Sequence, residues 1–270
     1  MQVLTERAGL AVEIDSRRLQ FKEPVTEPRL SVRTRSNLEA VWREPSRDPA
    51  DPELYSVYWG TVPIRDEAAF RQQDLDHAYV MILPGTWQGE YFKTQGHYHP
   101  PMGENHLGHP ELYYVLSGQG LFLLQHAAPP DWQVDDVVVV DVEPGGIVIV
   151  PPNYGHLTIN TGAEPLVFEA FLANWLQPVT ASYQARQGGA AYCLQTPEGP
   201  QIVPNERYER LPLIRRISAT SWELATSGVF YSAVASHLDR FAWLREPDSF
   251  HLAQVESELR ELAGAGVGHA

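Results

Sequence analysis

The sequence predicts a mainly β protein whose strands form a β-sandwich or barrel, with helical segments near both ends. Short apolar runs recur between residues 51 and 205, and turns rich in glycine and proline separate them. The 22 prolines and 20 glycines are spread along the chain, which favours many short strands over long helices. At 270 residues the chain is long enough to bury a large core.

Residues 1–50 are predicted to form an N-terminal arm of irregular structure followed by one short helix. The string SNLEAVW begins this helix, with Ser36 or Asn37 as its N-cap, because a side-chain oxygen there can accept a hydrogen bond from the first turn. Pro45 ends the helix, because proline cannot continue the helical hydrogen-bond pattern.

Residues 51–205 carry the predicted strands. They fall at 54–59, 78–83, 111–125 (two strands around the turn SGQG), 137–142, 147–150, 156–160, 166–172, 190–195 and 201–203. Gly118 and Gly120 are expected to supply the positive φ of a tight hairpin at SGQG. The string TPEGP predicts a second hairpin between the last two strands.

Residues 206–270 are predicted to form a partly helical extension that packs on the barrel or on a second subunit. Apolar residues recur there at helical spacing: Leu252, Val255, Leu259 and Leu262. Asp248 or Ser249 is the candidate N-cap of this helix, and a shorter helix is expected at 236–244.

Composition and charge exclude several classes of protein. The net charge of −14 argues against a nucleic-acid partner, because binding to a phosphate backbone depends on clustered lysine and arginine. No run of about 18 apolar residues is present, so no membrane-spanning helix is expected. The N-terminus lacks the basic head and apolar stretch of a signal peptide, and the lone Cys193 forbids an internal disulfide. We therefore expect a cytoplasmic protein with neither a membrane nor a nucleic-acid partner.

Four residues with metal-binding side chains stand on or beside the predicted strands. His97 and His99 lie two apart in the string GHYH, so in an extended segment both side chains point to the same face. Glu111 heads one predicted strand and His156 another. Three imidazole nitrogens and one carboxylate oxygen suit manganese, iron, nickel or zinc, and leave one or two positions open for substrate or water. The sequence therefore predicts a metal centre.

The spacings around these residues resemble both halves of the cupin motif. Glu111 is followed by six residues and a glycine, while Pro151 is followed five residues on by His156 and four further on by Asn160. With the HxH pair before them, these spacings extend the resemblance over about residues 50–205. The resemblance implies a double-stranded antiparallel β-barrel, the cupin or jelly-roll fold, with its metal bound inside.

The string PPMGENHLGHP, between the second histidine and Glu111, departs from the cupin spacing. Glu104, His106 and His109 in this insert compete with Glu111 for the carboxylate or extra-ligand role. We favour Glu111 because its spacing to Gly118 is intact and it heads a clear strand. The insert is predicted to be a lid or rim loop over the barrel mouth.

Three strings narrow the resemblance to one family. TQGHYHP, PELYYVLSGQG and PPNYGHLTIN resemble segments of the cupin-type glucose-6-phosphate isomerases of archaea and some bacteria. Carried over position by position, the resemblance implies a metal site formed by His97, His99, Glu111 and His156. It also implies sugar-phosphate contacts from Thr94, the Gly96 amide and Tyr113, and a sugar pocket lined by Tyr55 and Tyr183.

The reaction implied by this resemblance is the aldose–ketose interconversion of glucose 6-phosphate and fructose 6-phosphate at C1 and C2. One divalent metal ion per subunit is expected, iron first, with manganese, nickel or zinc as alternatives. Glu111 and Tyr113 are the candidate catalytic residues. Either Glu111 carries a proton between the carbons through an enediolate, or a hydride shifts directly, and the residues do not separate the two routes.

Other functions remain open at this point. Val80 stands where the family has a threonine near the phosphate, and Leu172 where it has a tyrosine near the sugar, so another sugar or sugar-phosphate isomerase is the closest alternative. A cupin dioxygenase would use the same ligands with an aromatic pocket, but strand alternation turns Tyr98 and Tyr114 away from the metal. A non-catalytic sugar-binding cupin would not need all four ligands.

A homodimer is expected, because cupins with exposed strand edges commonly pair and thereby cover those edges. The N-terminal arm and the C-terminal helix are both available for such an interface.

Overall fold

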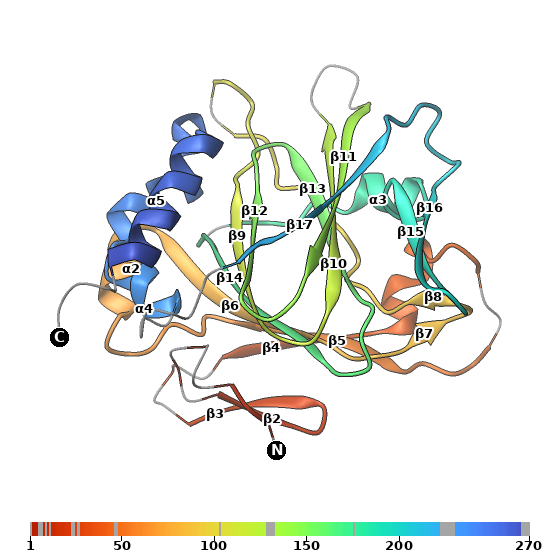
Figure 1. Cartoon of the computed structure of the whole chain (residues 1–270), viewed down its shortest axis with the longest axis horizontal. Helices are drawn as coiled ribbons and strands as arrows, with labels where there is room; N and C mark the ends of the chain where they lie inside the picture. Colours follow the sequence, from red (N-terminus) through yellow and green to blue (C-terminus); the bar gives the residue numbers. More distant parts are fainter. Residues whose placement is uncertain are drawn as a thin grey trace.

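Two β-sheets face each other and enclose the core of the protein (Figure 1). The computed structural model describes the chain except residues 1, 5–7, 9, 11, 23–24, 26–27, 46–47, 103, 128–132, 175, 222–229 and 266–270. Within the described residues, no helix is both long and apolar enough to cross a membrane.

The larger sheet has its strands in the order β18-β12-β9-β14-β6-β5-β4, and each neighbouring pair is antiparallel. The strands are β4 (Arg29–Thr34), β5 (Glu53–Trp59), β6 (Leu75–Ile82), β9 (Glu111–Ser117), β12 (Gly146–Val150), β14 (Leu166–Ala173) and β18 (Thr220–Ser221). The strands predicted at 54–59, 78–83, 147–150 and 166–172 are confirmed here with small changes at their ends.

The smaller sheet has the order β13-β10-β11-β17. Its strands are β10 (Gly120–Ala127), β11 (Val134–Val142), β13 (Tyr154–Asn160) and β17 (Ile214–Ser218). The first three pair antiparallel, whereas β17 joins β11 in parallel. The rings of Tyr113 and Phe168 from the larger sheet lie 5.0 and 5.2 Å from the ring of Phe122 in the smaller one. The core therefore lies between the two sheets. This confirms the prediction of a mainly β protein with the cupin fold.

The turn SGQG is a corner between the two sheets, and the predicted hairpin there is wrong. β9 before the turn belongs to the larger sheet and β10 after it to the smaller one. Gly118 has a φ of +81°, as expected, but Gly120 does not have a positive φ. Gly120 is required for another reason, because a Cβ there would lie 2.3 Å from the Ile159 carbonyl oxygen on β13. The two glycines thus let the chain change sheets without a clash.

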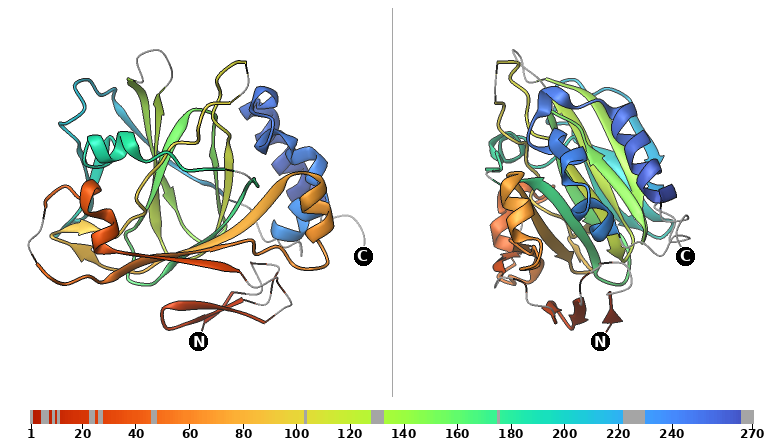
Figure 2. Two further views of the ribbon diagram at one scale, coloured as in Figure 1. Left: turned by 180° about the vertical axis from the view of Figure 1, so that it is seen from behind. Right: turned by 90° about the vertical axis from the view of Figure 1, so that its left-hand side faces the viewer.

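The N-terminal part is more regular than the predicted arm. β1 (Gln2–Val3), β2 (Val12–Asp15) and β3 (Arg18–Phe21) form a small antiparallel sheet of their own. Figure 2 shows this sheet below the barrel, beside β4. The amide of Leu19 donates a 2.9 Å hydrogen bond to the hydroxyl of Tyr58, so the small sheet packs on β5.

The short N-terminal helix is present, but as a 3-10 helix at η1 (Arg35–Val41) capped two or three residues earlier than predicted. Thr34 is its N-cap, and the amide of Thr34 donates to Asn37 Oδ1 at 2.9 Å. Ser36 is not the cap, because its amide donates instead to Asp51 Oδ1 at 2.7 Å. Asn37 therefore closes the turn from inside the helix and does not begin it.

A third sheet and a short helix lie at the end of the barrel remote from the C-terminus (Figure 1). The sheet has the order β16-β15-β8-β7, with β7 (Thr86–Trp87), β8 (Glu90–Tyr91), β15 (Ala191–Thr196) and β16 (Gly199–Pro204). β15 and β16 pair antiparallel around TPEGP, which confirms that hairpin. The helix α3 (Ala181–Ala185) was not predicted.

The C-terminal part supplies both strands and helices. β17 and β18 extend the two main sheets, as β4 does from the N-terminal side, so strands outside residues 51–205 belong to the barrel. The helical elements are α4 (Phe230–Ala235), η2 (Leu238–Leu244), η3 (Pro247–Ser249) and α5 (Leu252–Ala265). They lie on the same side of the molecule as α2 (Glu67–Gln72), which was not predicted (Figures 1 and 2). Stacking of Phe230 on Tyr114, at 4.5 Å, fixes α4 to the outer face of β9.

The cap predicted for the last helix is wrong by two or three residues. Asp248 and Ser249 form the short turn η3. The carbonyl of His251 accepts the hydrogen bonds from the amides of Gln254 and Val255, so α5 starts after His251. Three residues of the predicted apolar stripe, Val255, Leu259 and Leu262, are buried. Leu252 is 45% exposed, so its inclusion in the stripe was wrong.

Candidate metal centre

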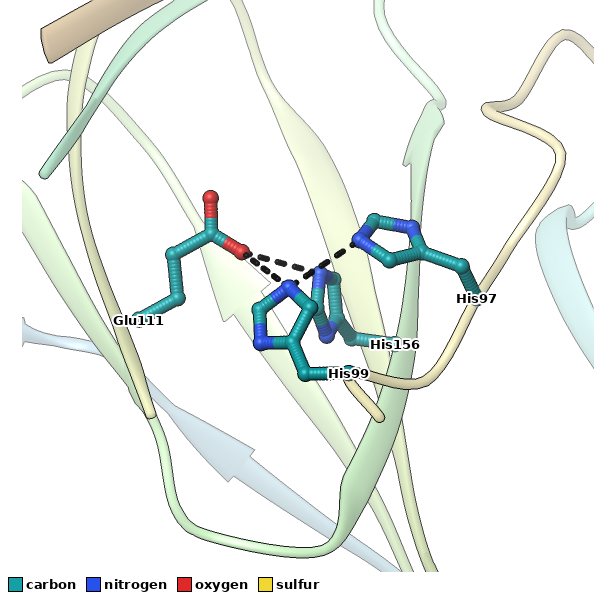
Figure 3. Close-up of side chains that lie close together, drawn as sticks. All are labelled: His97, His99, Glu111 and His156. Atoms are coloured by element: carbon teal, nitrogen blue, oxygen red, sulfur yellow. Dashed lines mark hydrogen bonds and ion pairs between the residues drawn. The ribbon is translucent and has the colours of Figure 1, made fainter. Parts of the chain in front are cut away.

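Four side chains converge inside the fold: His97, His99, Glu111 and His156 (Figure 3). Glu111 is the first residue of β9, His156 lies on β13, and the histidine pair comes from an extended segment beside β13. The amide of His97 donates to the His156 carbonyl at 3.1 Å, and the amide of His156 donates to the His97 carbonyl at 2.9 Å. This reciprocal pairing puts both rings on the inner face, with centroids 4.3 Å apart.

The distances between the donor atoms fit one metal ion. His99 Nε2 lies 3.3 Å from His97 Nε2 and 3.4 Å from Glu111 Oε2, and His156 Nε2 lies 3.2 Å from the same carboxylate oxygen. Ligand atoms at about 2.0–2.2 Å from an ion are separated from one another by about 3.0–3.5 Å in tetrahedral or octahedral arrangements. All four candidate ligand atoms lie within 4.8 Å of one another. The prediction that these four residues come together is confirmed.

The main chain of the insert orients one of the candidate ligands. His99 Nδ1 lies 2.6 Å from the carbonyl oxygen of His109, so this nitrogen carries the proton and donates it to the carbonyl. Nε2 of His99 then presents its lone pair to the cluster, as a metal ligand must. His109 is held in turn by its own Nδ1, which lies 3.1 Å from the carbonyl oxygen of Leu244 in η2. The insert and the C-terminal part therefore both support the centre.

The electrostatics of the cluster favour a bound cation. Burial lowers the pKa of His97 well below its usual value, and the neighbouring His156 and His99 lower it further. Burial alone would raise the pKa of Glu111, but contacts with His156 and His99 outweigh it and hold the pKa below its usual range. Glu111 Oε2 is buried and has no hydrogen-bond donor among the described residues. A carboxylate that faces neutral imidazole lone pairs is satisfied by a cation placed between them.

The competing residues of the insert lie outside the cluster. Glu104 and His106 are exposed, and the ring of His109 bonds to the C-terminal part as described above. The choice of Glu111 over these three residues agrees with the geometry. Among the described residues of the insert, the one that bonds to the cluster is His109, through its backbone carbonyl.

Tyr113 lies beneath the cluster, two residues along β9 from Glu111. Its hydroxyl oxygen is 2.9 Å from His156 Nε2. Burial raises the pKa of Tyr113 well above its usual value, and the nearby Glu111 raises it further. The Tyr113 hydroxyl therefore lies directly beside the donor atoms. Tyr98 and Tyr114 point elsewhere, because Tyr98 accepts a hydrogen bond from Gln125 and Tyr114 stacks on α4.

The segment before the histidine pair is held tightly at Thr94 and Gly96. The amide of Thr158 donates to Thr94 Oγ1 at 3.0 Å, which ties the segment to β13. Gly96 has a φ of +81°, and a Cβ there would come within 2.6 Å of the Tyr183 ring. Tyr183 is fully buried under this turn, and Tyr55 is 7% exposed on the inner face of β5. Whether these four residues contact a substrate stays a prediction.

The two positions that depart from the family pattern are apolar and buried. Val80 on β6 is 8% exposed and Leu172 on β14 is 5% exposed. Neither side chain can supply a hydrogen bond to a sugar or a phosphate.

Two backbone groups of the site could not be predicted from the residue types. The His109 and Leu244 carbonyls act through the main chain, so their roles do not depend on which side chains they carry. The proximity of the insert to a ligand was the one available signal, because a loop that leaves His99 and returns at Glu111 must pass the centre.

A family model and curated relatives match this chain. The model described as "Glucose-6-phosphate isomerase (GPI)" matches residues 32–209. A "Glucose-6-phosphate isomerase" of Thermococcus litoralis is 34% identical over 160 residues, which cover 57% of this chain and 75% of the relative. The protein of the same name from Pyrococcus furiosus is 30% identical over 190 residues, covering 67% and 88%. A "Putative glucose-6-phosphate isomerase 1" of Rhizobium meliloti is 34% identical over 125 residues, covering 44% and 53%.

Solved structures also show a likeness. Oxalate decarboxylase from Bacillus subtilis is 24% identical, with a TM-score of 0.32, over 45% of this chain and 26% of that one. The strand order of the two main sheets itself shows the fold.

Proposed function

This chain belongs to the glucose-6-phosphate isomerase family, and we propose that it interconverts glucose 6-phosphate and fructose 6-phosphate with one divalent metal ion per subunit. The observation that supports the proposal most is the convergence of three imidazole nitrogens on one buried carboxylate, within the span that the family model matches. An isomerase of this kind is an enzyme of glycolysis and gluconeogenesis.

The proposed ligands are His97, His99, Glu111 and His156. Three nitrogen donors and one oxygen donor suit iron, with manganese, nickel or zinc as alternatives. A bound divalent ion would supply Lewis-acid polarisation of the substrate's carbonyl group.

The chain's own residues would orient the sugar and handle its protons. Glu111 and Tyr113 are the proposed catalytic residues, because they are neighbours on the inner face of β9. The second carboxylate oxygen of Glu111 is the group that could take a proton from C1 or C2 and return it to the other carbon. If a hydride shifts instead, the Tyr113 hydroxyl still orients the substrate oxygens, since it lies beside the ligand atoms.

We propose that Thr94, the Gly96 amide and Tyr113 contact the sugar phosphate, and that Tyr55 and Tyr183 line the sugar pocket. The positive φ of Gly96 supports this, because a residue without a side chain lets a ligand approach the backbone closely. The ring of Tyr183 packs directly against the Gly96 turn, which supports its place in the wall of this pocket.

We also propose a homodimer. Each subunit has an N-terminal arm (1–50), a cupin barrel formed mainly by residues 51–205 and a C-terminal extension (206–270), and the arm and the extension add β4, β17 and β18 to the barrel. The edge strand β17 supports this, because Ile217 is 48% exposed and Leu213 just before the strand is 86% exposed. A molar mass of one subunit in light scattering would contradict the dimer.

The test is an assay of the protein after its metal is stripped and replaced by iron, manganese, nickel or zinc, with fructose 6-phosphate as substrate. We expect turnover to glucose 6-phosphate that depends on the metal. No turnover with metal bound would shift the proposal to another sugar. Failure to bind any metal would contradict the proposed centre itself.

A further inference from the structure

The inner face of the larger sheet carries an arginine at its open edge. Arg33 on β4 lies directly opposite Tyr55 on β5. Farther across the sheet, the same face carries Ile82 and Phe168, and the ring of Phe168 contacts Phe122 of the smaller sheet. Side chains opposite each other in adjacent strands lie on one face, so Arg33 is on the face that looks toward the metal centre.

Arg33 and the segment before the histidine pair both lie near the side chain of Tyr55. Burial raises the pKa of Tyr55, and the nearby backbone of Gln95 and side chain of Arg33 oppose that rise. Gln95 stands between Thr94 and Gly96, the two residues proposed above to contact the phosphate. Tyr55 therefore stands between Arg33 and that segment.

Arg33 is also free of acidic partners. Arg33 is an exposed residue, and no described carboxylate lies within ion-pair distance of it, whereas Arg18 and Arg35 are paired with Glu53 and Glu39. An exposed, unpaired guanidinium can accept a doubly charged anion without first breaking an ion pair.

The other cation beside this segment is not available to a ligand. Lys93 is 2% exposed and faces away from the metal centre. Its ammonium group bonds to the carboxylate of Glu90 and donates to the carbonyl of Val41 at 2.8 Å. In a chain of net charge −14, an anionic substrate therefore needs a cation from elsewhere.

We infer that Arg33 recognises the phosphate group of the substrate, and that Tyr55 holds its guanidinium against the Thr94–Gly96 segment. The inference rests on the proposed function and adds a specificity-determining residue to it. Arg33 forms hydrogen bonds to two phosphate oxygens, while backbone and hydroxyl groups of the segment bind the third. Arg33 thus selects phosphorylated sugars over free ones.

The test compares Arg33→Gln and Arg33→Lys with Arg29→Gln. Arg29 is the matched control, because it lies on the same face of the same strand but stacks over Trp59, opposite a different part of β5. Loss of a charge-assisted contact should raise the KM for fructose 6-phosphate about 10–100-fold in Arg33→Gln and leave kcat within about threefold. Arg33→Lys should recover part of the loss, and Arg29→Gln should resemble the unchanged protein.

A second measurement keeps this inference separate from the isomerase proposal. Binding of inorganic phosphate to the metal-loaded protein, followed by calorimetry, needs no turnover. We expect Arg33→Gln to weaken phosphate binding by the same factor as it raises KM. Absence of phosphate binding in the unchanged protein, or equal binding by Arg33→Gln, would overturn the inference even if isomerase activity is found.

A purely supporting role for Arg33 predicts a different pattern. If Arg33 only braces Tyr55, then Tyr55→Phe should raise KM as much as Arg33→Gln, and the double variant should be no worse than either. If Arg33 binds the phosphate, then Tyr55→Phe should raise KM less than Arg33→Gln does. The double variant should then have a KM at least as high as that of Arg33→Gln.

Discussion

Two clusters of histidine and glutamate lie on opposite faces of the larger sheet, and only one of these two brings together enough donor atoms to hold a metal ion. The inner cluster places Glu111 of β9 among three imidazoles. The outer cluster pairs His77 of β6 with Glu169 of β14. The closest contacts are alike: Nε2 of His77 lies 3.3 Å from Glu169 Oε2, and Nε2 of His156 lies 3.2 Å from Glu111 Oε2.

The outer cluster gives both ring nitrogens of its one histidine a partner, while the second carboxyl oxygen of Glu169, Oε1, has none among the described residues. His77 and Glu169 are both 0% exposed, and Thr61 Oγ1 lies 2.8 Å from His77 Nδ1. Burial lowers the pKa of His77 to about 3 and raises that of Glu169 well above its usual value. The pair is therefore neutral, with the carboxylic acid donating to Nε2. A single proton can link one imidazole to one carboxyl group. A carboxylate that faces three imidazoles needs a cation, because only a cation can accept lone pairs from all of these groups at once.

Replacing each glutamate by glutamine should give the largest difference between the two clusters. Glu111→Gln removes an anionic ligand, so we expect loss of bound metal and a fall in isomerase activity of about 1,000-fold or more. Glu169→Gln keeps the shape and the donor of a protonated carboxyl, so its activity should stay near that of the unchanged protein. Elemental analysis and turnover of fructose 6-phosphate measure both effects. Normal activity in Glu111→Gln would contradict its roles as ligand and as base.

Replacing a histidine of the outer cluster should mainly lower stability, whereas replacing one of the inner cluster should mainly lower activity. His77→Ala leaves a buried cavity and an unsatisfied carboxyl, so it should lower the free energy of unfolding by about 2–4 kcal/mol. Its activity per folded, metal-loaded molecule should be unchanged, because His77 faces away from the site. His97→Ala should instead abolish activity and cost less stability in the metal-free protein. Urea unfolding monitored by fluorescence gives both free energies, and an equal loss of stability in the two variants would contradict the distinction.

The inner cluster was predictable from the sequence because most of its residues lie in short motifs with fixed spacing. An HxH pair in an extended segment points both rings one way, and the spacing from Pro151 to His156 and Asn160 is carried by one turn and one strand. The outer pair was not predictable in the same way. His77 and Glu169 are 92 residues apart and meet only because β6 and β14 pair with a particular register. Nothing in either segment identifies that register.

The errors in the fold have physical causes of the same kind. SGQG carries the glycines of a hairpin, but a corner between sheets needs them equally, and only the close approach of β13 to Gly120 separates the two. β4 and β17 are rich in arginine and lack an apolar run, so the sequence did not predict that they are strands paired with β5 and β11. The position of the barrel strands followed from alternation, whereas their partners depended on contacts between distant segments.

A third prediction tests how rigidly the inner cluster is held. Gly96→Ala would drive a Cβ into the Tyr183 ring and displace the histidine pair that follows, so metal affinity should fall about 10–100-fold. Gly89→Ala is the matched control, because Gly89 has nearly the same φ, +83°, but no atom within 4 Å of the added Cβ. Both variants share the backbone strain, so a metal titration isolates the clash. Equal affinities would show that the turn is not held by Tyr183.

The smallest expected effect is a pH dependence that belongs to the outer pair alone. The pKa of Glu169 in the folded protein lies above its ordinary value of 4.5. Above that pH the unfolded chain releases this proton while the folded protein keeps it, so the unfolded state binds fewer protons and the contribution of Glu169 to stability falls as pH rises. For His77 the sign is opposite: its folded pKa of about 3 lies below the ordinary 6.5, so its contribution is lost as pH falls below 6.5.

Between pH 4.5 and 6.5 the two slopes cancel, because the unfolded pair carries one proton on histidine and the folded pair carries one on glutamate. Tyr231 and Asp66, which bond to each other nearby, are unchanged by the substitution. In Glu169→Gln the glutamate contribution is absent. The free energy of unfolding of the variant, relative to the unchanged protein, should therefore rise with pH by up to about 1.4 kcal/mol per unit. Urea unfolding of both proteins at pH 5, 6, 7 and 8 measures this difference, and a value independent of pH would mean that Glu169 is ionised in the fold.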